Sequence, residues 1–267
     1  MSKIGFIGGG NMATAIINGI IKGKTLPANE ITVCDISQEC LSRFASQGLC
    51  ICSDAAKLVE SCKYVVLSVK PQVAEGVLEG ISKSVNDETV IISIAAGITA
   101  KLIRKKIGFN CRLVLVMPNT PLLIGAGSVA VARLEPITDE EFEFASGIFK
   151  QSGSVEIIPE DKLNEVIPIN GSSPALIYRL AQIICEYGKG YGFDEETSNR
   201  LFCNALIGSA KMMLETGKTH DELIKAVCSP GGTTLKGLEA LEENNFAAAV
   251  TGYMDACVKR AYELGKK

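Results

Sequence analysis

Short apolar runs rich in β-branched residues alternate with amphipathic stretches from Lys3 to about Ile158. This alternation predicts βαβ units around a parallel sheet, because parallel strands are buried on both faces by the helices that connect them. We expect helices in the intervals between the strands. The predicted strands are Lys3–Ile7, Glu30–Cys34, Cys50–Cys52, Tyr64–Ser68, Thr89–Ile94, Arg112–Met117, Ser128–Ala132 and Ser154–Ile158.

Two of the intervening helices are placed by their apolar faces. The first has Met12, Ile16 and Ile20 at the three-to-four-residue spacing of a helix. A later helix is expected to begin at a cap formed by Asp139, with Phe142 on its apolar side. We interpret both apolar stripes as core rather than as functional surface.

After about Pro159 the β-branched runs stop and helical periodicity continues to the end of the chain. Pro174 stands near the start of a long predicted helix, and Asp194 is placed to cap another. The sequence therefore predicts an α/β fold with an N-terminal Rossmann-type, mostly parallel sheet and a C-terminal all-helical domain. We expect the dinucleotide-binding domain in residues 1–160 and the helical dimerisation and substrate domain in residues 161–267.

Charge and hydropathy exclude several classes of function. The net charge is −3, from 27 basic and 30 acidic residues interspersed along the chain, so no basic surface is expected to bind nucleic acid. The longest apolar runs, such as Val90–Ile98, are about half of the ~20 residues that a membrane span requires. The first predicted strand begins near Lys3, which leaves no room for a secretory signal, and we expect a cytoplasmic protein.

Neither the cysteines nor the histidine content predicts a metal centre. The ten cysteines are scattered, and several fall in apolar segments where cysteine behaves as a small buried hydrophobe. Cys50 and Cys52 form a C-x-C pair, but no second pair follows at zinc-finger spacing. His220 is the only histidine, which excludes most hydrolytic schemes that depend on histidine.

A glycine-rich turn follows the first predicted strand and precedes the first predicted helix. It reads Gly8-x-Gly10-x-x-Ala13, and this position is the one that the dinucleotide fingerprint requires. Gly8 permits a tight turn, Gly10 allows close approach of a pyrophosphate, and Ala13 keeps the helix near the strand. With Asn11 and Met12 the turn is predicted to bind the cofactor at the positive end of the helix. A plain structural turn is the alternative.

Asp35 stands at the end of the second predicted strand, where an acidic side chain can accept the ribose hydroxyls of the adenosine half. It would repel a 2′-phosphate, and no arginine directly follows it in residues 35–38. The expected cofactor is NADH or NADPH, with a preference for NADH. The alternative is that Asp35 merely caps a helix beginning at Gln38.

Three further turns are expected at the same edge of the sheet, beside the cofactor. Ser68, Lys70 and Pro71 follow one central strand, Ala96 follows the next, and Asn119 follows the one after. Ligands of open α/β sheets collect at the carboxyl ends of the strands, so we predict that these five residues bind the cofactor. An exposed lysine that only terminates its strand is the alternative for Lys70.

The most specific segment is the one from Ser229 to Thr234, which precedes an apolar helical pattern. Gly231 and Gly232 let the backbone present successive N–H groups, and Thr233 and Thr234 add hydroxyl donors at the start of a helix. Such a turn suits a carboxylate. An ordinary helix cap would need only one of these residues.

With these segments in order, the chain resembles the pyrroline-5-carboxylate reductase family over essentially its whole length. The matching segments are Gly8–Ala13, Val69–Gln72, Ala95–Gly97, Met117–Pro121, Gly171–Ala175 and Ser229–Thr234. The resemblance implies an oxidoreductase that reduces 1-pyrroline-5-carboxylate, an imine carboxylate, to L-proline with NAD(P)H in proline biosynthesis. It also implies a homodimer with interlocked helical domains, in some members assembled into larger rings.

The resemblance also gives the Ser229–Thr234 turn its roles. The backbone N–H groups of Gly231, Gly232 and Thr233 would bind the substrate carboxylate with help from Ser229, and the Thr234 hydroxyl would contact the imine nitrogen. Because an imine can arrive already protonated, positioning and electrostatics suffice without a strong general acid.

The chain departs from the family pattern at several positions near the expected site. These positions are Ala55, Asn170, Ser173, Leu176, Asn204 and Ala226. They leave two alternatives open: an NAD(P)-binding regulatory protein without turnover, and a reductase of a related imine or hydroxy acid on the same fold. A hydroxyacid dehydrogenase would need a lysine near the first interdomain helix, and the segment from Asn170 to Pro174 offers none.

Overall fold

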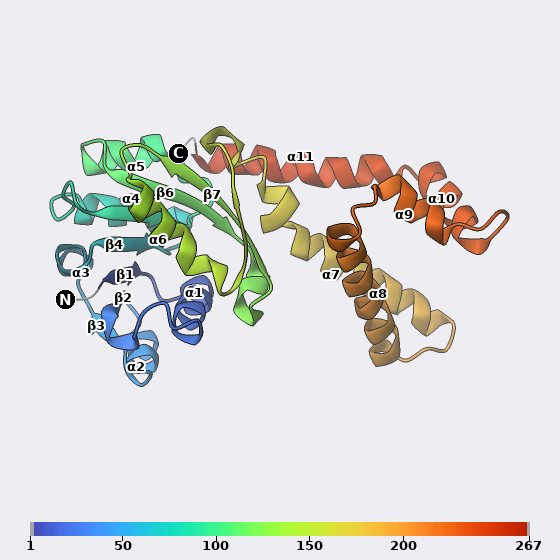
Figure 1. Cartoon of the computed structure of the whole chain (residues 1–267), viewed down its shortest axis with the longest axis horizontal. Coiled ribbons are helices and arrows are strands. Elements are labelled where there is room, and N and C mark those ends of the chain that lie inside the picture. Colours follow the sequence, from blue (N-terminus) through green and yellow to red (C-terminus); the bar gives the residue numbers. More distant parts are fainter. Residues whose placement is uncertain (1–2, 266–267) are drawn as a thin grey trace. The chain divides into compact units, whose positions relative to one another are not determined.

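The computed structural model describes residues 3–265, which form two compact units. The first unit contains the chain up to Pro174 together with the residues from Ala256 onward, and the second contains Ala175–Asp255. Figure 1 labels their elements along the chain. The predicted division into residues 1–160 and 161–267 stays a prediction, and the two compact units are described separately below.

The first unit is built on an eight-stranded sheet with the order β3-β2-β1-β4-β5-β6-β7-β8. All neighbouring strands are parallel except β6 and β7. The strands are β1 (Ile4–Ile7), β2 (Ile31–Cys34), β3 (Cys50–Cys52), β4 (Tyr64–Leu67), β5 (Val90–Ser93), β6 (Arg112–Pro118), β7 (Gly127–Leu134) and β8 (Gly153–Ile157). All eight predicted strands are present, so the predicted fold class is confirmed.

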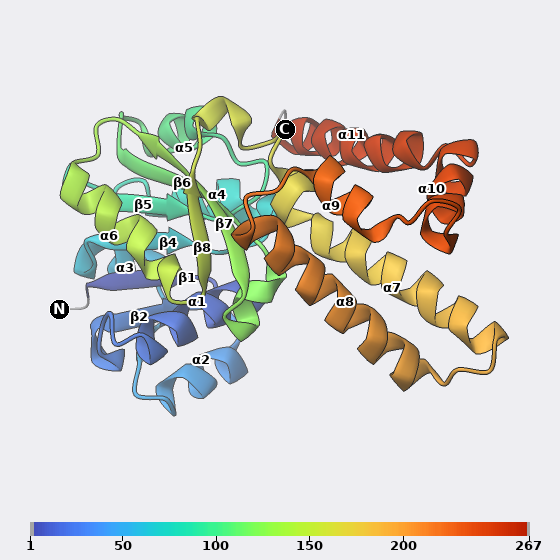
Figure 2. The ribbon, with the colours of Figure 1, turned by 45° about the vertical axis from the view of Figure 1, so that its right-hand side comes forward.

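Helices cover both faces of the sheet (Figure 2). The helices α1 (Asn11–Lys22), α2 (Gln38–Ala45) and α6 (Asp139–Lys150) share a buried core with one face. On the other face the core contains side chains of α3 (Ala55–Ser61), α4 (Pro71–Ile81) and α5 (Ala100–Ile107). Every residue of β1, β2, β4 and β5 is buried, which is why these strands read as continuous apolar runs rather than as alternating ones.

The predicted cap of α6 was wrong by one residue. Thr138 has an extended backbone, and its hydroxyl accepts a hydrogen bond from the backbone N–H of Glu141 at 3.3 Å. The Glu141 carboxylate in turn accepts the backbone N–H of Thr138 at 3.1 Å, which completes a capping box. Asp139 already lies inside the helix, and its carboxylate forms an ion pair with Arg133.

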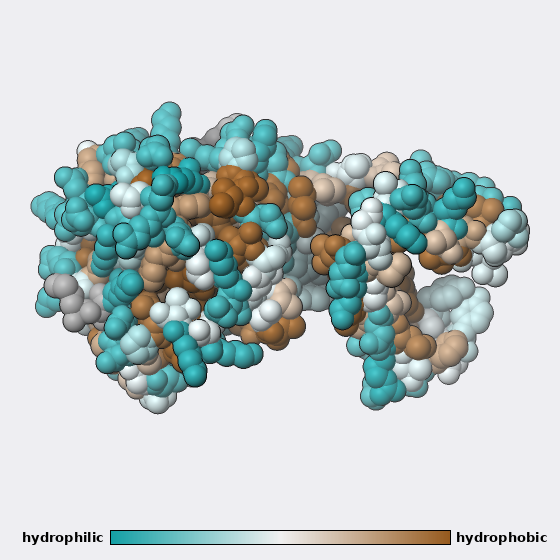
Figure 3. Space-filling view, viewed as in Figure 1, coloured by the Kyte–Doolittle hydropathy of each residue, from teal (hydrophilic) through white to brown (hydrophobic). Residues whose placement is uncertain are grey.

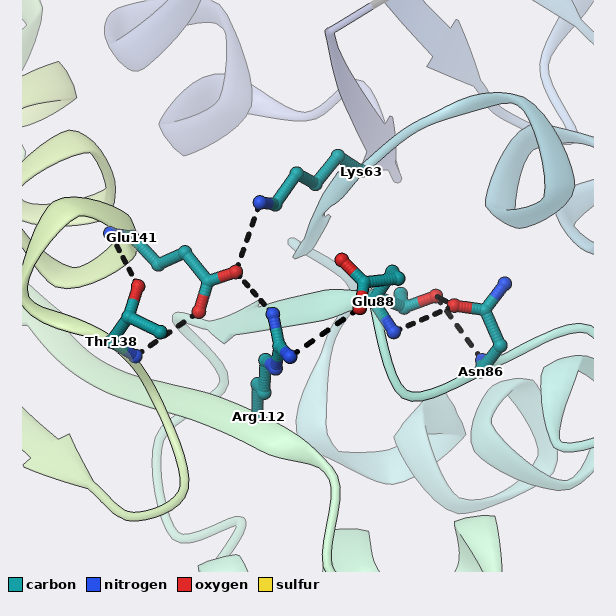
Figure 4. Close-up of polar contacts among 7 residues, drawn as sticks. Lys63, Asn86, Glu88, Arg112, Thr138 and Glu141 are labelled. Carbon is teal, nitrogen blue, oxygen red and sulfur yellow. Dashed lines mark hydrogen bonds and ion pairs between the residues drawn. The ribbon is translucent and has the colours of Figure 1, made fainter.

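The same Glu141 carboxylate connects the start of α6 with the residue before β4 and with the first residue of β6, at the amino-terminal edge of the parallel strands (Figure 4). It is 3% exposed, and it forms ion pairs with Lys63, at 2.9 Å, and with Arg112, the first residue of β6. Burial alone would raise the pKa of this carboxyl, but the hydrogen bonds from Lys63, Thr138 and Arg112 outweigh burial and lower its pKa to about 2. The cluster therefore stabilises the fold at the edge opposite to the predicted ligand edge.

The second half of the chain is helical, as predicted. Its α-helices are α7 (Ser173–Gly190), α8 (Glu195–Glu215), α9 (His220–Val227), α10 (Thr233–Glu243) and α11 (Phe246–Gly265). Pro174 is the second residue of α7, and the Asp194 carboxylate caps α8 by accepting the N–H of Thr197 at 2.7 Å. Both predictions are confirmed. None of the helices that the structure describes is long and apolar enough to cross a membrane.

The last turns of α11 belong to the sheet unit. Ala261 is 3% exposed, and the turn after β5 lies close to it at Gly97. Gly97 has a φ of +77°, and a Cβ atom there would lie 3.0 Å from Cβ of Leu264. Both the backbone conformation and the close approach of α11 therefore require glycine at this turn.

The helical unit leaves much apolar side-chain surface uncovered within a single chain. Leu214 is 85% exposed and Val227 is 68% exposed, and Figure 3 shows apolar surface among these helices. Large exposed apolar patches mark surfaces that bind a partner.

Candidate active site

The glycine-rich turn between β1 and α1 has the geometry that the fingerprint predicts. Gly8 has a φ of +98°, and a Cβ atom there would lie 2.7 Å from the carbonyl oxygen of Ser68, so only glycine fits. Gly10 is the N-cap of α1, and no atom lies within 4 Å of where its Cβ would be. No described side chain caps this helix, so its first N–H groups remain available to an anion.

A cavity of about 430 Å³ lies at the carboxyl ends of the central strands. Six of the residues predicted to bind the cofactor line it: Gly10, Asn11, Met12, Ser68, Lys70 and Ala96. The other lining residues are Val69, Ile94, Met117, Pro118, Ile167, Gly171 and Ser172. All belong to the sheet unit, and we refer to this cavity as the cofactor crevice.

Ser68 and Lys70 contribute to the crevice in different ways. The Ser68 hydroxyl lies 2.7 Å from the carbonyl oxygen of Gly8 and donates a hydrogen bond to it, which braces the glycine turn. Lys70 is the N-cap of α4 and is exposed, so its ammonium is available to a ligand at the edge of the crevice. Pro71 is the first residue of α4 and does not line the crevice.

Asp35 lies beside the glycine turn rather than at a helix cap. One carboxylate oxygen accepts the backbone N–H of Gly9 at 2.7 Å, and the other accepts the N–H of Ser37 at 2.8 Å. The cap of α2 is Ser37, whose hydroxyl accepts the N–H of Cys40 at 3.3 Å. Gly8 and Asp35 therefore shape the turn from positions outside the crevice lining.

Arg43 also contacts the glycine turn, and the sequence interpretation missed it. Its guanidinium donates hydrogen bonds to the carbonyl oxygen of Gly9 at 3.0 Å and to the Thr14 hydroxyl at 3.1 Å. The residues directly after Asp35, at positions 36–38, include no basic side chain. Arg43 comes from the second turn of α2, which the fold brings back toward the glycine turn.

Asn119 was predicted to bind the cofactor, but its side chain makes internal hydrogen bonds. It is 7% exposed; its Oδ1 accepts the N–H of Ser128 at 2.9 Å, and its Nδ2 donates to the carbonyl oxygen of Asn170 at 3.2 Å. The Nδ2 atom of Asn170 donates to the carbonyl oxygen of Met117 at 2.9 Å. These bonds fix the π-helical segment Ile167–Gly171, which supplies part of the crevice wall.

The predicted carboxylate turn lies in the helical unit and leads directly into α10. Gly231 has a φ of +70°, the N–H of Gly232 donates to the carbonyl oxygen of Ser229 at 2.9 Å, and Gly232 is the N-cap of the helix. No described side chain caps α10, so the N–H groups of its first turn remain available. Thr233 and Thr234 are exposed in the single chain.

Thr234 also lines an apolar groove of about 800 Å³ within the helical unit. The groove contains side chains of α8, α9 and α10, among them Met212, Leu223 and Val227. His220 and Ala226 line it as well, and the other lining residues are mostly small or apolar.

Comparison with known proteins assigns the family. The chain is 34% identical to a pyrroline-5-carboxylate reductase from Escherichia coli strain K12, over 99% of this chain and 98% of that protein. It is 32% identical to a pyrroline-5-carboxylate reductase from Methanosarcina acetivorans, over 99% of this chain and 98% of that protein. The chain belongs to the pyrroline-5-carboxylate reductase family.

The family profiles and solved structures agree with this assignment. A profile described as pyrroline-5-carboxylate reductase dimerisation matches residues 160–264, and one described as NADP oxidoreductase, coenzyme F420-dependent, matches residues 3–97. The structure of a pyrroline-5-carboxylate reductase from Coxiella burnetii has a TM-score of 0.91 and 33% identity, with 100% of this chain and 99% of that chain covered.

A pyrroline carboxylate reductase from Plasmodium falciparum, solved with NADP bound, has a TM-score of 0.91 and 27% identity. That comparison covers 99% of this chain and 98% of that chain. The predicted resemblance, the oxidoreductase class and the use of a nicotinamide cofactor are thereby confirmed. The roles of the individual site residues stay predictions.

Proposed function

We propose that this reductase converts 1-pyrroline-5-carboxylate to L-proline, the last step of proline biosynthesis, with the glycine turn of the sheet unit and the Ser229–Thr234 turn of the helical unit as its two binding elements. Family membership over the whole chain supports the reaction. The observation that supports the residue assignment is the crevice of about 430 Å³ at the carboxyl ends of the strands, bounded by uncapped N–H groups of α1.

The residues of the crevice fit a dinucleotide. The N–H groups at the start of α1, from Asn11 and Met12, would hold the pyrophosphate, while the absence of a side chain at Gly10 admits it closely. Lys70 adds a positive charge at the edge of the crevice. Each carboxylate oxygen of Asp35 accepts one backbone N–H, from Gly9 or Ser37, and keeps a further lone pair with which it would accept a ribose hydroxyl. Bound there, the nicotinamide supplies the hydride for the C=N carbon.

The Ser229–Thr234 turn would hold the substrate. Its carboxylate fits the uncapped N–H groups at the start of α10, next to Gly231 and Gly232. The Thr234 hydroxyl would hydrogen-bond the imine nitrogen and orient its proton, so that the nitrogen is protonated when the carbon receives the hydride. The product then carries one new C–H bond and one N–H bond.

We also propose that the functional form is a cytoplasmic homodimer. The dimerisation profile covers residues 160–264, and the helical unit exposes apolar side chains such as Leu214 and Val227. A second copy of the chain would bury this surface. All ten cysteines are free thiols, which suits a reducing compartment. A small imine carboxylate, and no nucleic acid, is the expected binding partner.

The test is oxidation of NADH and of NADPH by purified protein with 1-pyrroline-5-carboxylate, followed at the nicotinamide absorbance, with proline identified as the product. Turnover with either cofactor supports the proposal. Cofactor binding without turnover would favour a regulatory protein, and turnover only with another imine or with a hydroxy acid would favour the other alternative. Light scattering on the same sample reports the oligomeric state.

A further inference from the structure

Cys34 and Cys52 face each other at the carboxyl ends of two neighbouring strands. The parallel pairing of β2 with β3 places them directly opposite one another, each as the last residue of its strand. Among the paired positions of the described strands, this is the one where two cysteines meet. Cys34 belongs to the core that α3, α4 and α5 share, and Cys52 packs against that core. The two thiols are therefore neighbours on one face of the sheet.

The spacing of the two strands is compatible with a disulfide bond. Neighbouring strands lie about 4.8 Å apart, and disulfides join residues whose Cα atoms are ~4.4 to 6.8 Å apart. The Cβ atoms of a disulfide are about 3.8 Å apart, so a bond between these strands would draw their ends together by roughly 1 Å. β3 is free to follow, because it is three residues long and lies at the edge of the sheet beside β2.

The two thiols differ in their access to a reagent. Cys34 is 7% exposed, and burial, together with the nearby Cys52, Asp35 and Asp54, raises the pKa of its thiol to about 11. The thiolate is the nucleophilic form, so Cys34 reacts slowly at neutral pH. Cys52 is only half-buried and belongs to the edge strand. A reagent from solution therefore meets Cys52 first, and Cys34 is placed to complete a bond from the inner side.

The end of β2 also holds the glycine turn at which the dinucleotide is proposed to bind. The carbonyl oxygen of Cys34 accepts the N–H of Gly8 at 2.8 Å, and the carboxylate of the next residue, Asp35, accepts the N–H of Gly9 at 2.7 Å. Two consecutive residues of β2 and its end thus fix two consecutive residues of the turn. A displacement of Cys34 would therefore displace the turn.

We propose that Cys34 and Cys52 form a reversible disulfide that weakens cofactor binding when the protein meets an oxidising low-molecular-weight disulfide. The Cys52 thiolate attacks one sulfur of the reagent, one reagent thiolate leaves, and a mixed disulfide forms. Cys34 then loses its proton and attacks the Cys52 sulfur, which releases the second reagent thiolate. The leaving thiolates take up the two protons that the cysteines lose. Two protein thiols are oxidised, and one reagent disulfide is reduced to two thiols.

The displacement of the strand ends makes this disulfide a reversible one. A strained disulfide is reduced more readily than an unstrained one. In a reducing compartment both thiols are therefore free and the glycine turn keeps the geometry described above. The effect on the cofactor depends on the binding role proposed above for that turn.

Peptide mapping tests the bond itself. The full-length protein is equilibrated in buffers of rising ratios of oxidised to reduced glutathione, its free thiols are alkylated, and linked peptides are identified by mass spectrometry after proteolysis without reduction. The expected result is a link between Cys34 and Cys52 that dithiothreitol removes. A link from Cys52 to Cys50 or to Cys62 instead, or glutathione adducts alone at the most oxidising ratio, overturns the assignment.

The dissociation constant of NADH, measured by calorimetry, tests the consequence. Oxidation is expected to raise it about tenfold, because a hydrogen bond that holds the turn is weakened, and dithiothreitol should restore it. Cys52→Ser should show the affinity of the reduced wild-type protein in both conditions, and Cys34→Ala should form no intramolecular link. Cys50→Ser, the same change two residues earlier on β3, should respond as the wild-type protein does. A loss of affinity on oxidation of Cys52→Ser that equals the wild-type loss contradicts the proposal.

NADH must in turn oppose formation of the disulfide, because coupling between two equilibria is reciprocal. If the disulfide form binds NADH tenfold more weakly, saturating NADH raises the midpoint potential of the cysteine pair by about 30 mV. A disulfide that forms while both the NADH affinity and this potential stay unchanged refutes the effect on the cofactor. A reduced protein that binds no NADH contradicts the proposed cofactor site instead, so the two failures are distinguishable.

Discussion

Asn119 and Asn170 fix each other's segments through their side-chain amides. Nδ2 of Asn119 donates to the carbonyl oxygen of Asn170, and Nδ2 of Asn170 donates to the carbonyl oxygen of Met117, two residues before Asn119. Both residues are buried. The pair joins the end of β6 to the π-helical segment and so gives the cofactor crevice part of its wall.

Replacing Asn170 by alanine is expected to destabilise the protein by about 1 to 3 kcal/mol, because the carbonyl oxygens of Met117 and Ser128 lose a buried donor. Chemical denaturation measures the free energy of unfolding. Asn199→Ala, on an exposed face of α8, serves as the control and should cost less than about 1 kcal/mol. If the two variants are equally stable, the pair has no structural role.

NADH should be used at least as well as NADPH, because the Asp35 carboxylate would repel a 2′-phosphate. Asp35→Ser is expected to move the ratio of kcat/KM values toward NADPH. The same change removes the acceptor for the Gly9 N–H, so the KM for both cofactors should rise. The ratio of the kcat/KM values for NADPH and NADH therefore decides the outcome.

Asp87→Ser, at an exposed turn, controls for the loss of one negative charge in the Asp35 experiment. A strong preference of the wild-type protein for NADPH that Asp35→Ser leaves unchanged would show that Asp35 only supports the glycine turn. Arg43 would then be the first residue to replace, because its guanidinium contacts the same turn.

Thr234→Val is expected to lower kcat by ~10- to 1000-fold with a smaller change in KM if the hydroxyl acts mainly in the transition state, as proposed above. The N-cap of α10 is Gly232, so loss of this hydroxyl should change stability by less than about 1 kcal/mol. Steady-state kinetics and a thermal melt on one preparation provide both values. Thr251→Val, within α11, is the control. An unchanged kcat with a lowered melting temperature removes Thr234 from the mechanism.

The Glu141 cluster predicts how stability depends on pH. Its folded pKa of about 2 lies below the ordinary value of 4.5, so the stabilisation is fully present above pH 4.5 and is lost as the pH falls toward 2. The difference corresponds to a contribution on the order of 3 kcal/mol. Unfolding free energies at several pH values should therefore fall more steeply for the wild-type protein than for Glu141→Gln.

Glu143→Gln removes a carboxylate from the same helix at an exposed position, and its pH profile should follow that of the wild-type protein. Parallel profiles for the wild-type protein and Glu141→Gln would mean that the contacts with Lys63 and Arg112 add no net stability.

The features that the sequence predicted well are local ones. A strand that is buried on both faces, such as Val90–Ser93, is written in the sequence as a run of apolar residues. Position 8 has a φ of +98°, which requires glycine, so the turn is visible as a glycine directly after a strand. The sheet, the helices and the glycine turn therefore appeared in the expected places.

The features that it missed depend on contacts between distant residues. Asn119 follows a strand at the ligand edge, as a cofactor residue would, and only the presence of Asn170 reveals that its amide is used internally. Arg43 reaches the glycine turn from the next helix, and Tyr262 reaches Glu165 from the end of the chain. Nothing in the local pattern around these three residues indicates their partners.

The packing of Ala261 and Leu264 beside the turn at Gly97 affects the order in which the protein can assemble during synthesis. The strands of the sheet are translated early, whereas the end of α11, which covers this turn, is translated after α7 to α10. The first unit therefore has to wait, with the turn after β5 uncovered, until the whole helical unit has been made. A chaperone that binds this turn could therefore affect the sheet after all of its strands have been synthesised. A ribosome that stalls before α11 is complete would leave the turn exposed.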